Sequence, residues 1–328
     1  MPASAIYCAP VPARDEEHSS NFHHQQDGRE PVRSAAEDAR RRGAVVVAFG
    51  LKPERIVGAE GRIDAVPEPP SAEQAGLLVE ALRSGIDAGG TVVAIVPEWF
   101  HPDGLKRLEM ARVLLDTDRV AIHITALPPL AATALASLAS SLAPRLLSAG
   151  LLASVLEGLE TQIHTITWLG TVTGLKHPAP SLGQHVSSLA PGTAFAVTSF
   201  PQPAVHRIRQ GEAGVPVPRI ERPSRLVVAA RNGDDEWLTG PVNEALGGLP
   251  VLRIEPTPQG PAYWSTGKVV EGAVCPADVD ALAAEIMQTA EAWACRWCGE
   301  LIARSPCPLC GHRARPRRLP RPQQGART

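Results

Sequence analysis

Aromatic residues are scarce in this chain: they make up 4% of its 328 residues, against 44% for all hydrophobic residues. Leu, Val, Ile and Ala must therefore fill the core, and the length allows one large domain or two of ordinary size. The first twenty residues contain no positively charged start followed by an apolar run, so we expect no secretory signal. The formal net charge of −2 favours no class of partner.

The sequence also lacks the motifs of several enzyme classes. The first apolar run is followed by a single glycine in AFGLKPE, where a dinucleotide-binding fingerprint needs three. Gly267-Lys268 has no glycine five residues before it, and Val269 follows where a phosphate-binding loop requires Ser or Thr. No Gly-x-Ser-x-Gly elbow occurs, which disfavours a hydrolase of that fold. None of these three chemistries is indicated.

A membrane-spanning helix is disfavoured as well. The least polar stretch, residues 126–144, carries no charge, but two prolines break its start and Ala and Ser dilute it. A membrane span needs about 20 strongly apolar residues.

The arrangement of the cysteines indicates the compartment. Four of the six cysteines form one C-terminal cluster, which is not typical of a disulfide framework. We therefore expect a cytoplasmic protein that makes no membrane contact.

Apolar runs of strand length alternate with helical patterns over residues 43–294. AVVVAFG, TVVAIVPEWF, RVAIHITALP and QIHTITWLG are runs of this kind, and segments with helical spacing lie between them. Strands that are apolar on both faces and alternate with helices predict an α/β fold. We expect a mostly parallel sheet covered by helices, with Rossmann-like layering. The Pro-rich residues 201–224 are a possible boundary within this domain.

Both ends of the chain have a composition typical of disorder. Residues 1–42 contain almost no apolar side chains and cannot offset the entropy of ordering them. Residues 313–328, RARPRRLPRPQQGART, carry six arginines and no acid. We predict a disordered arm at 1–42, the α/β domain at 43–294, a small ribbon at 295–312 and a basic disordered tail at 313–328.

The ribbon is predicted from two Cys-x-x-Cys pairs, each followed by a glycine that lets the chain turn back sharply. The pairs are Cys295 with Cys298 and Cys307 with Cys310, and the glycines are Gly299 and Gly311. Four thiolates facing one another form a closed tetrahedral site, which suits a structural zinc ion. Residues 295–312 resemble the short zinc-ribbon family, and this resemblance implies one zinc per chain. Iron, which uses the same sulfur ligands in a rubredoxin-like site, is the alternative.

The ribbon and the arginines that follow it suggest a binding role. Arginines spaced by prolines can follow a phosphate backbone, and a ribbon offers a small rigid platform. We therefore expect a zinc-binding α/β protein with a binding or regulatory role, whose ribbon and Arg-rich tail contact a protein or a nucleic acid.

The alternative is an enzyme that acts on a phosphate- or carboxylate-bearing small molecule at the carboxyl edge of the sheet, where open α/β sheets bind ligands. Glu98, His101 and Asp103 follow a predicted strand and are candidate catalytic residues. Asp234 and Asp235 follow another strand and are candidates for the same reason. Asp103 and Asp234 are equally well placed to cap the helices that come next.

One loop and two strands contain further polar candidates. Residues 174–185 form a Gly- and Pro-rich loop in which Lys176, His177 and His185 are candidate cofactor-binding residues. His123 and His164 lie in the middle of predicted strands. For these two we expect buried core histidines with hydrogen-bond partners.

Overall fold

All the residues described below belong to one compact unit, Ala35–Thr328. The predicted arm at 1–42 lies outside the described residues, as does the predicted tail apart from Arg313. The computed structural model describes residues 44–49, 51, 63–66, 75–87, 90–99, 104–146, 148–199, 202–209 and 212–313.

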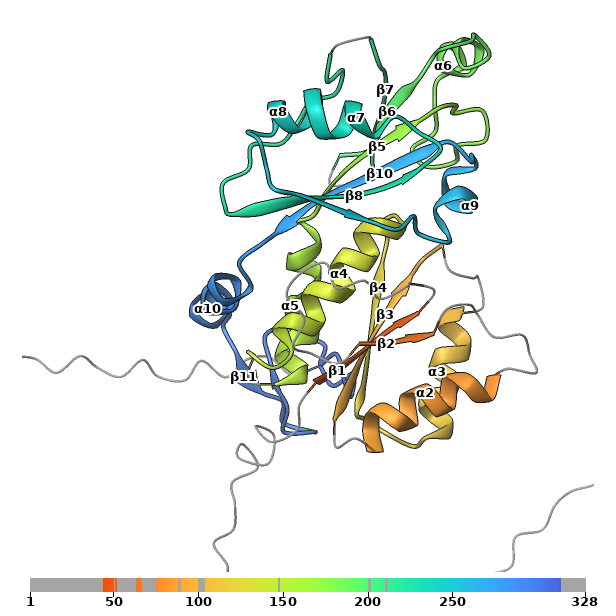
Figure 1. Cartoon of the computed structure of the whole chain (residues 1–328). Helices are drawn as coiled ribbons and strands as arrows, with labels where there is room; N and C mark the ends of the chain where they lie inside the picture. The colour runs from red at the N-terminus through yellow and green to blue at the C-terminus, as the bar shows by residue number, and fades with distance from the viewer. Residues whose placement is uncertain are drawn as a thin grey trace, which may run out of the picture. The chain divides into compact units, whose positions relative to one another are not determined.

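The first sheet has four parallel strands in the order β2-β1-β3-β4. Every residue of β3 is buried, as expected for a strand with helices on both faces. Helices α2 (Ala75–Asp87) and α3 (Gly104–Leu114) lie on one side of the sheet, and α4 (Pro129–Leu142) and α5 (Ala149–Glu160) lie on the other (Figure 1). The strands are β1 (Ala44–Phe49), β2 (Ile63–Val66), β3 (Thr91–Pro97) and β4 (Val120–Thr125).

Helix α4 (Pro129–Leu142) is buried along its whole length, whereas α5 (Ala149–Glu160) buries one face. A helix that is apolar on all sides must be surrounded by protein or by lipid. Here it contacts both β1 of the first sheet and β10 (Val269–Pro276), which belongs to a second sheet. Within the described ranges no helix is long and apolar enough to cross a membrane.

The second sheet has six strands in the order β7-β6-β5-β10-β8-β9, and only β8 and β9 pair in parallel. The predicted α/β fold is confirmed, and the parallel pairing holds for the first sheet. The second sheet is mainly antiparallel. The sequence does not predict this, because its central strands are buried on both faces and have the continuous apolar pattern typical of parallel strands. Its strands are β5 (His164–Leu169), β6 (Phe195–Thr198), β7 (Ala204–Arg207), β8 (Ser224–Arg231), β9 (Val251–Ile254) and β10 (Val269–Pro276).

Different elements pack against the two faces of the second sheet. The inner face packs on α4 through residues such as Ala273 and Cys275. The outer face packs on a short helical segment and on apolar residues of the loop 213–220. That segment consists of α7 (Asp235–Trp237), η2 (Leu238–Val242) and α8 (Asn243–Ala245).

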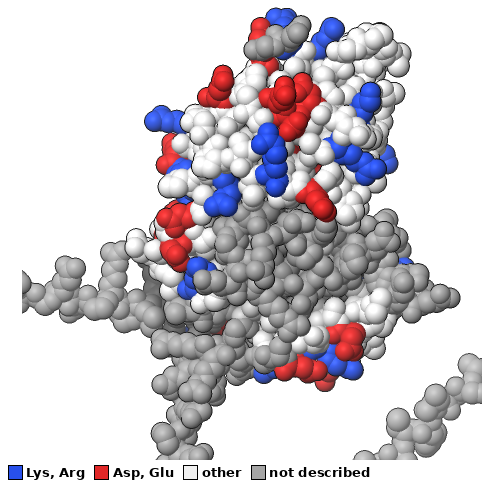
Figure 2. Space-filling view, in the orientation of Figure 1, with Lys and Arg blue, Asp and Glu red and all other residues white. Residues whose placement is uncertain are grey.

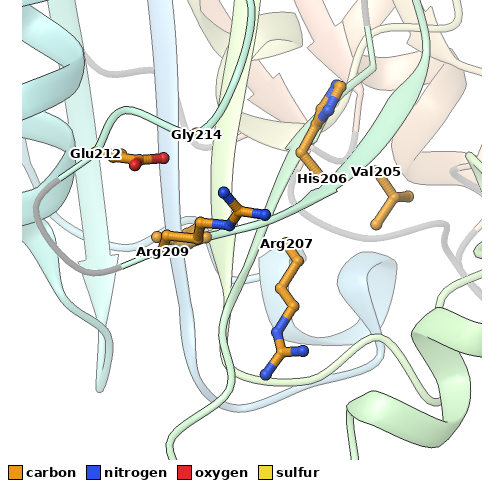
Figure 3. A pocket seen from close by; sticks show the side chains of 7 residues that line it. Val205, His206, Arg207, Arg209, Glu212 and Gly214 are labelled. Atoms are coloured by element: carbon orange, nitrogen blue, oxygen red, sulfur yellow. The ribbon is translucent and has the colours of Figure 1, made fainter.

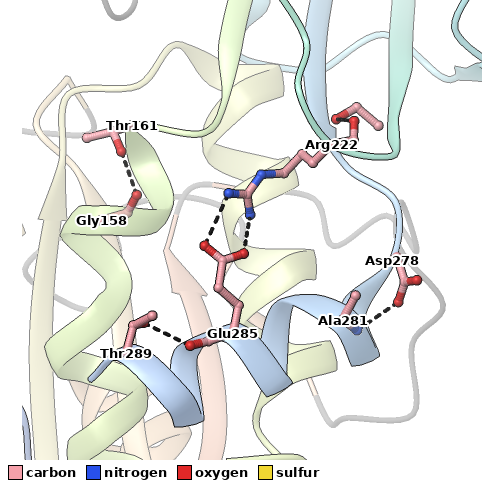
Figure 4. A network of polar contacts seen from close by, with 8 residues as sticks. Gly158, Thr161, Arg222, Asp278, Ala281, Glu285 and Thr289 are labelled. Carbon is pink, nitrogen blue, oxygen red and sulfur yellow. Dashed lines mark hydrogen bonds and ion pairs between the residues drawn. The ribbon is translucent and has the colours of Figure 1, made fainter. Parts of the chain in front are cut away.

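Three helices and a hairpin complete the structure. Helix α10 is joined to the segment before β8 by Arg222, whose guanidinium donates two hydrogen bonds, of 3.0 and 3.3 Å, to the carboxylate of Glu285 (Figure 4). The ribbon follows α10 directly. The remaining elements are α6 (Leu182–Ser187), α9 (Gly260–Trp264), α10 (Val279–Thr289), β11 (Trp293–Ala294) and β12 (Leu301–Ile302).

Because α4 is packed on every side, truncating one of its apolar side chains should lower the free energy of unfolding markedly. Leu135 is 0% exposed, and we expect Leu135→Ala to lower the free energy of unfolding by roughly 2–5 kcal/mol. Leu114, which is 72% exposed on α3, supplies the same substitution as a control, with an expected change within about 0.5 kcal/mol. Urea unfolding of both variants measures the difference, and equal losses would contradict the central place of α4.

Candidate functional site

The predicted catalytic residues do not form one cluster within the described part of the chain. Glu98 is exposed just after β3, and His101 and Asp103 lie outside the described residues. Asp234 caps α7 by accepting a hydrogen bond of 3.1 Å from the Trp237 backbone N–H. Asp235 pairs with Arg253 at 3.2 Å. Both aspartates therefore have structural partners of their own.

The predicted cofactor-binding loop leads into α6. Lys176 and His177 are exposed, and His185 is half-buried on the helix. Gln184, also on α6, donates a hydrogen bond of 2.7 Å to the backbone carbonyl of Val205 in β7. The loop therefore lies beside the edge of the second sheet.

The two mid-strand histidines have different surroundings. His123 is a buried core residue, as expected, with its Nε2 2.9 Å from Glu160 Oε1. His164 is half-buried, and its buried Nδ1 has no hydrogen-bond partner in the described structure. Burial lowers the pKa of His164, which keeps the ring neutral near pH 7. A neutral imidazole with an unpaired nitrogen is suited to bind a polar group of a ligand.

His164 lines an apolar cavity of about 480 Å³ on the outer face of the second sheet, which we call the chamber. Its volume lies within the range of roughly 300–1,000 Å³ typical of small-molecule sites. Strands β5, β6 and β7 form its floor, and the loop 216–218 forms another wall. The lining includes His164, Ile166, Thr198, His206, Val217 and Pro218.

The sheet register explains why these side chains meet. Ala196 of β6 pairs with His206 of β7, and Thr198 pairs with Ala204. Paired residues point to the same face, and alternate residues along a strand share that face. His206 therefore lies on the outer face with Thr198, beyond the area that the short helices cover.

A second cavity of about 800 Å³ surrounds β7, the edge strand, and we call it the basic cleft. Its lining includes Arg207, Arg209, Glu212 and His206 (Figure 3). In that view the Arg209 guanidinium lies between Glu212 and His206, and Arg207 points away from them. His206 also lines the chamber, so one side chain separates an apolar cavity from a charged one.

A buried carboxylate lies where α4 meets the second sheet. Glu271 of β10 is 3% exposed and accepts hydrogen bonds from Thr257 Oγ1, Trp264 Nε1 and the Leu130 backbone N–H at the start of α4. Burial raises the pKa of the Glu271 carboxyl, and the three hydrogen bonds offset part of that rise. We call this group of residues the seam.

Aromatic rings extend the seam towards Glu98. Trp99 packs edge-on against Tyr263, with centroids 5.6 Å apart, and Tyr263 packs edge-on against Trp264 at 4.8 Å. Burial, together with the Glu271 and Glu98 carboxylates, raises the pKa of Tyr263 to about 12. Glu98 therefore lies beside a structural aromatic cluster.

The four ribbon cysteines come together as predicted. Their sulfur atoms lie within 4.8 Å of one another, so they could hold a metal ion. Gly299 and Gly311 have φ of 74° and 72°, and their N–H groups donate to the carbonyls of Cys295 and Cys307. Glycine adopts this left-handed conformation without strain, which explains its place after each pair.

The ribbon is docked on the α/β body. Ser148, the N-cap of α5, donates a hydrogen bond of 2.8 Å to the Leu301 carbonyl, and Arg112 of α3 donates one of 2.7 Å to the Leu309 carbonyl. A Cβ at Gly150 would lie 2.7 Å from the Leu301 oxygen, so the contact with α5 requires glycine there. Cys295 and Leu309 also belong to the core cluster that contains α4.

Comparison with known proteins identifies the fold. No family model matches the chain, and no curated protein is similar to it in sequence. A DegV family protein from Corynebacterium glutamicum has a TM-score of 0.52 at 11% identity, covering 74% of this chain and 98% of that one. A DegV family protein from Thermus thermophilus, described for its fatty acid binding, has a TM-score of 0.52 at 13% identity, covering 71% and 99%. At these identities the likeness shows that the chain shares the fold of these proteins.

The predicted role of a regulatory zinc protein whose ribbon and Arg-rich tail contact a protein or a nucleic acid is wrong. The fold is that of DegV family proteins, and the one from Thermus thermophilus is described for binding a fatty acid, a small molecule. The ribbon itself is packed against α5 and does not project from the body.

The sequence pattern does not predict the chamber. Its walls come from three strands and from the loop 216–218, which are separated in sequence and mostly apolar. The available signal was the Pro-rich segment 201–224, which the sequence presents as a possible boundary within the domain. In the structure that segment supplies β7 and the loop over the outer face.

The seam should make stability depend on pH. Because the folded-state pKa of Glu271 is raised, folding takes up a proton between the unfolded pKa and the higher folded one. In that window the wild type loses stability as pH rises, by at most about 1.4 kcal/mol per pH unit for one group. Glu271→Gln cannot titrate, so we expect its stability relative to the wild type to improve as the pH rises above 4.5, the ordinary pKa of a glutamate, towards the raised folded value. Urea unfolding across this range measures the change.

The control for losing one carboxylate is Glu244→Gln on the exposed side of α8. Identical pH dependence in the wild type and in Glu271→Gln would show that folding takes up no proton at Glu271.

Proposed function

We propose that this protein binds a single-chain amphiphile of the fatty acid class and that the chamber holds the alkyl chain. The observation that carries the proposal is the apolar cavity of about 480 Å³ on the outer face of the second sheet. The shared fold supports it, since the protein from Thermus thermophilus with this fold is described for fatty acid binding.

The chamber walls suit an alkyl chain. Ile166, Val217 and Pro218 offer apolar contact, and the loop 216–218 lies across the floor that the strands provide. Each buried methylene contributes roughly 0.8 kcal/mol, which is about a fourfold gain in affinity. Affinity should therefore rise with chain length until the chamber is full and then level off.

The test is a chain-length series on protein freed of bound lipid, in which saturated fatty acids displace a fluorescent fatty acid. We expect Val217→Trp, which fills the chamber from the loop, to weaken binding of the longer acids by about tenfold or more. Val113→Trp, at a position 76% exposed on α3, is the matched control and should leave affinity unchanged. Affinity that does not change with chain length, or that survives Val217→Trp, would refute the chamber as the site.

We further propose that Cys295, Cys298, Cys307 and Cys310 hold one structural zinc ion. Four sulfur ligands within 4.8 Å of one another suit tetrahedral zinc, and all four positions are filled by protein. Such a site needs reduced cysteines, which fits a reducing compartment such as the cytoplasm. Its role is to hold the ribbon against α5, because the ribbon supplies Ile302 and Leu309 to the core.

Elemental analysis of the purified protein should find about one zinc per chain. We expect Cys298→Ser to lose the metal and to lower the melting temperature by several degrees, since the docked ribbon is part of the core. Trp297→Ala changes a neighbouring residue that is 77% exposed and should keep both the zinc and the melting temperature. Iron in place of zinc, or no metal at all, would overturn the assignment.

A further inference from the structure

Helix α6 presents its apolar side to solvent. Leu182, Val186 and Leu189 are 82%, 64% and 75% exposed. Because they are four and three residues apart, they lie on one side of a helix with 3.6 residues per turn. Leu189 follows the end of α6, but its N–H still donates to the Val186 carbonyl, so the chain keeps turning there. We call these three side chains the apolar ridge.

The polar side of α6 is turned towards the protein. Gln184 donates a hydrogen bond of 2.7 Å to the Val205 carbonyl of β7, and Ser188 Oγ accepts one of 3.0 Å from the Val172 backbone N–H. By the same helical spacing, Gln184 and Ser188 lie on the side opposite the apolar ridge. A surface helix of a globular protein has the reverse arrangement, with its apolar stripe facing the core. The orientation of α6 therefore indicates a further apolar surface that covers the ridge.

The charges of the segment that contains α6 are all positive. Residues 161–211 contain no Asp or Glu, although the whole chain has 34 acidic residues, and they carry Lys176, Arg207 and Arg209. The upper right corner of Figure 2, where Figure 1 places α6, shows white and blue atoms and no red ones. Charge complementarity therefore favours an anionic partner. A second copy of this chain would bring the same cations against one another, which disfavours a symmetric dimer through the apolar ridge.

The side chains of the apolar ridge suit lipid better than protein. Contacts that dominate protein interfaces are enriched in Trp, Tyr and Arg, whereas Leu and Val are under-represented among them. The ridge consists of Leu and Val alone. Aliphatic side chains enter the boundary between headgroups and acyl chains, while neighbouring cations attract anionic headgroups. With six residues, α6 is far shorter than a membrane span, so such a contact is peripheral.

We propose that α6 docks this protein on the surface of a bilayer with anionic headgroups, with the apolar ridge inserted at the start of the acyl chains. The inference goes beyond the proposed function and does not depend on it, because it requires neither the chamber nor a ligand in it. It departs from the prediction that the protein makes no membrane contact. That prediction rested on the lack of a spanning helix, and three side chains on a short helix leave no such signal in the sequence.

The experiment sediments the full-length protein with vesicles of phosphatidylcholine alone and with vesicles that contain equal parts of phosphatidylcholine and phosphatidylglycerol. We expect tighter binding to the mixed vesicles, and the difference should shrink as salt rises. Leu182→Gln/Leu189→Gln should weaken binding to the mixed vesicles by about tenfold or more and leave the melting temperature unchanged.

The matched control is Met110→Gln/Leu114→Gln on α3, where the two side chains are 64% and 72% exposed. Glu109, Asp116 and Asp118 lie close to them in sequence, so this site lacks the positive surroundings of α6. The control should bind vesicles as the wild type does. Both double variants retain the six arginines of residues 313–328, so any contribution of those arginines is the same in every sample.

A second measurement tests insertion directly. Leu182→Trp places a fluorophore on the apolar ridge, and bromine on the acyl chains of the vesicles quenches a tryptophan that reaches them. Leu182→Trp should be quenched more than the wild type with its six native tryptophans, and Leu114→Trp should not.

Three results would overturn the proposal. The wild type fails to bind either kind of vesicle, or Leu182→Gln/Leu189→Gln binds as the wild type does and Leu182→Trp shows no added quenching. In the third, the wild type is a dimer that Leu182→Gln/Leu189→Gln converts to a monomer, so a second copy covers the ridge. None of them affects the proposed function, which the chain-length series tests without vesicles.

Discussion

The placement of the second sheet depends on one buried carboxylate. Glu271 accepts hydrogen bonds from the start of α4, from Thr257 and from Trp264, which belong to three separate segments. An unpaired polar group in such a place would be costly, so these donors must converge whenever the chain is folded. Because α4 also packs on the first sheet, this single group sets the position of β10 relative to both halves of the core.

The seam and the chamber lie on opposite faces of the second sheet. Ala273 and Cys275, which alternate with Glu271 along β10, pack on the inner core, whereas Ile166 and Ala196 belong to the outer cluster. A ligand can therefore enter the chamber without opening the contact between α4 and β10. The inner face packs in the protein core and contributes to the stability of the fold. The docked ribbon adds its own apolar residues to the same core.

The sequence predicts local features of this protein better than distant ones. The cysteine pairs lie within eighteen residues of one another, and the chain curls them together as expected. The α/β class is also correct, because apolar strands alternate with helices. The antiparallel second sheet is not predicted, since a strand such as β10 is buried on both faces and carries no sign of its direction. The chamber is missed because His164 and His206 meet only through the sheet register, and Val217 reaches them from a loop that is distant in sequence from His164.

Edge strands need protection against pairing with other chains, and charged side chains are a common means of providing it. Arg207 and Arg209 on and just after β7 serve that purpose whether or not a ligand binds. Protection alone requires only charge, so the two arginines account for the solvated edge of β7 without any ligand.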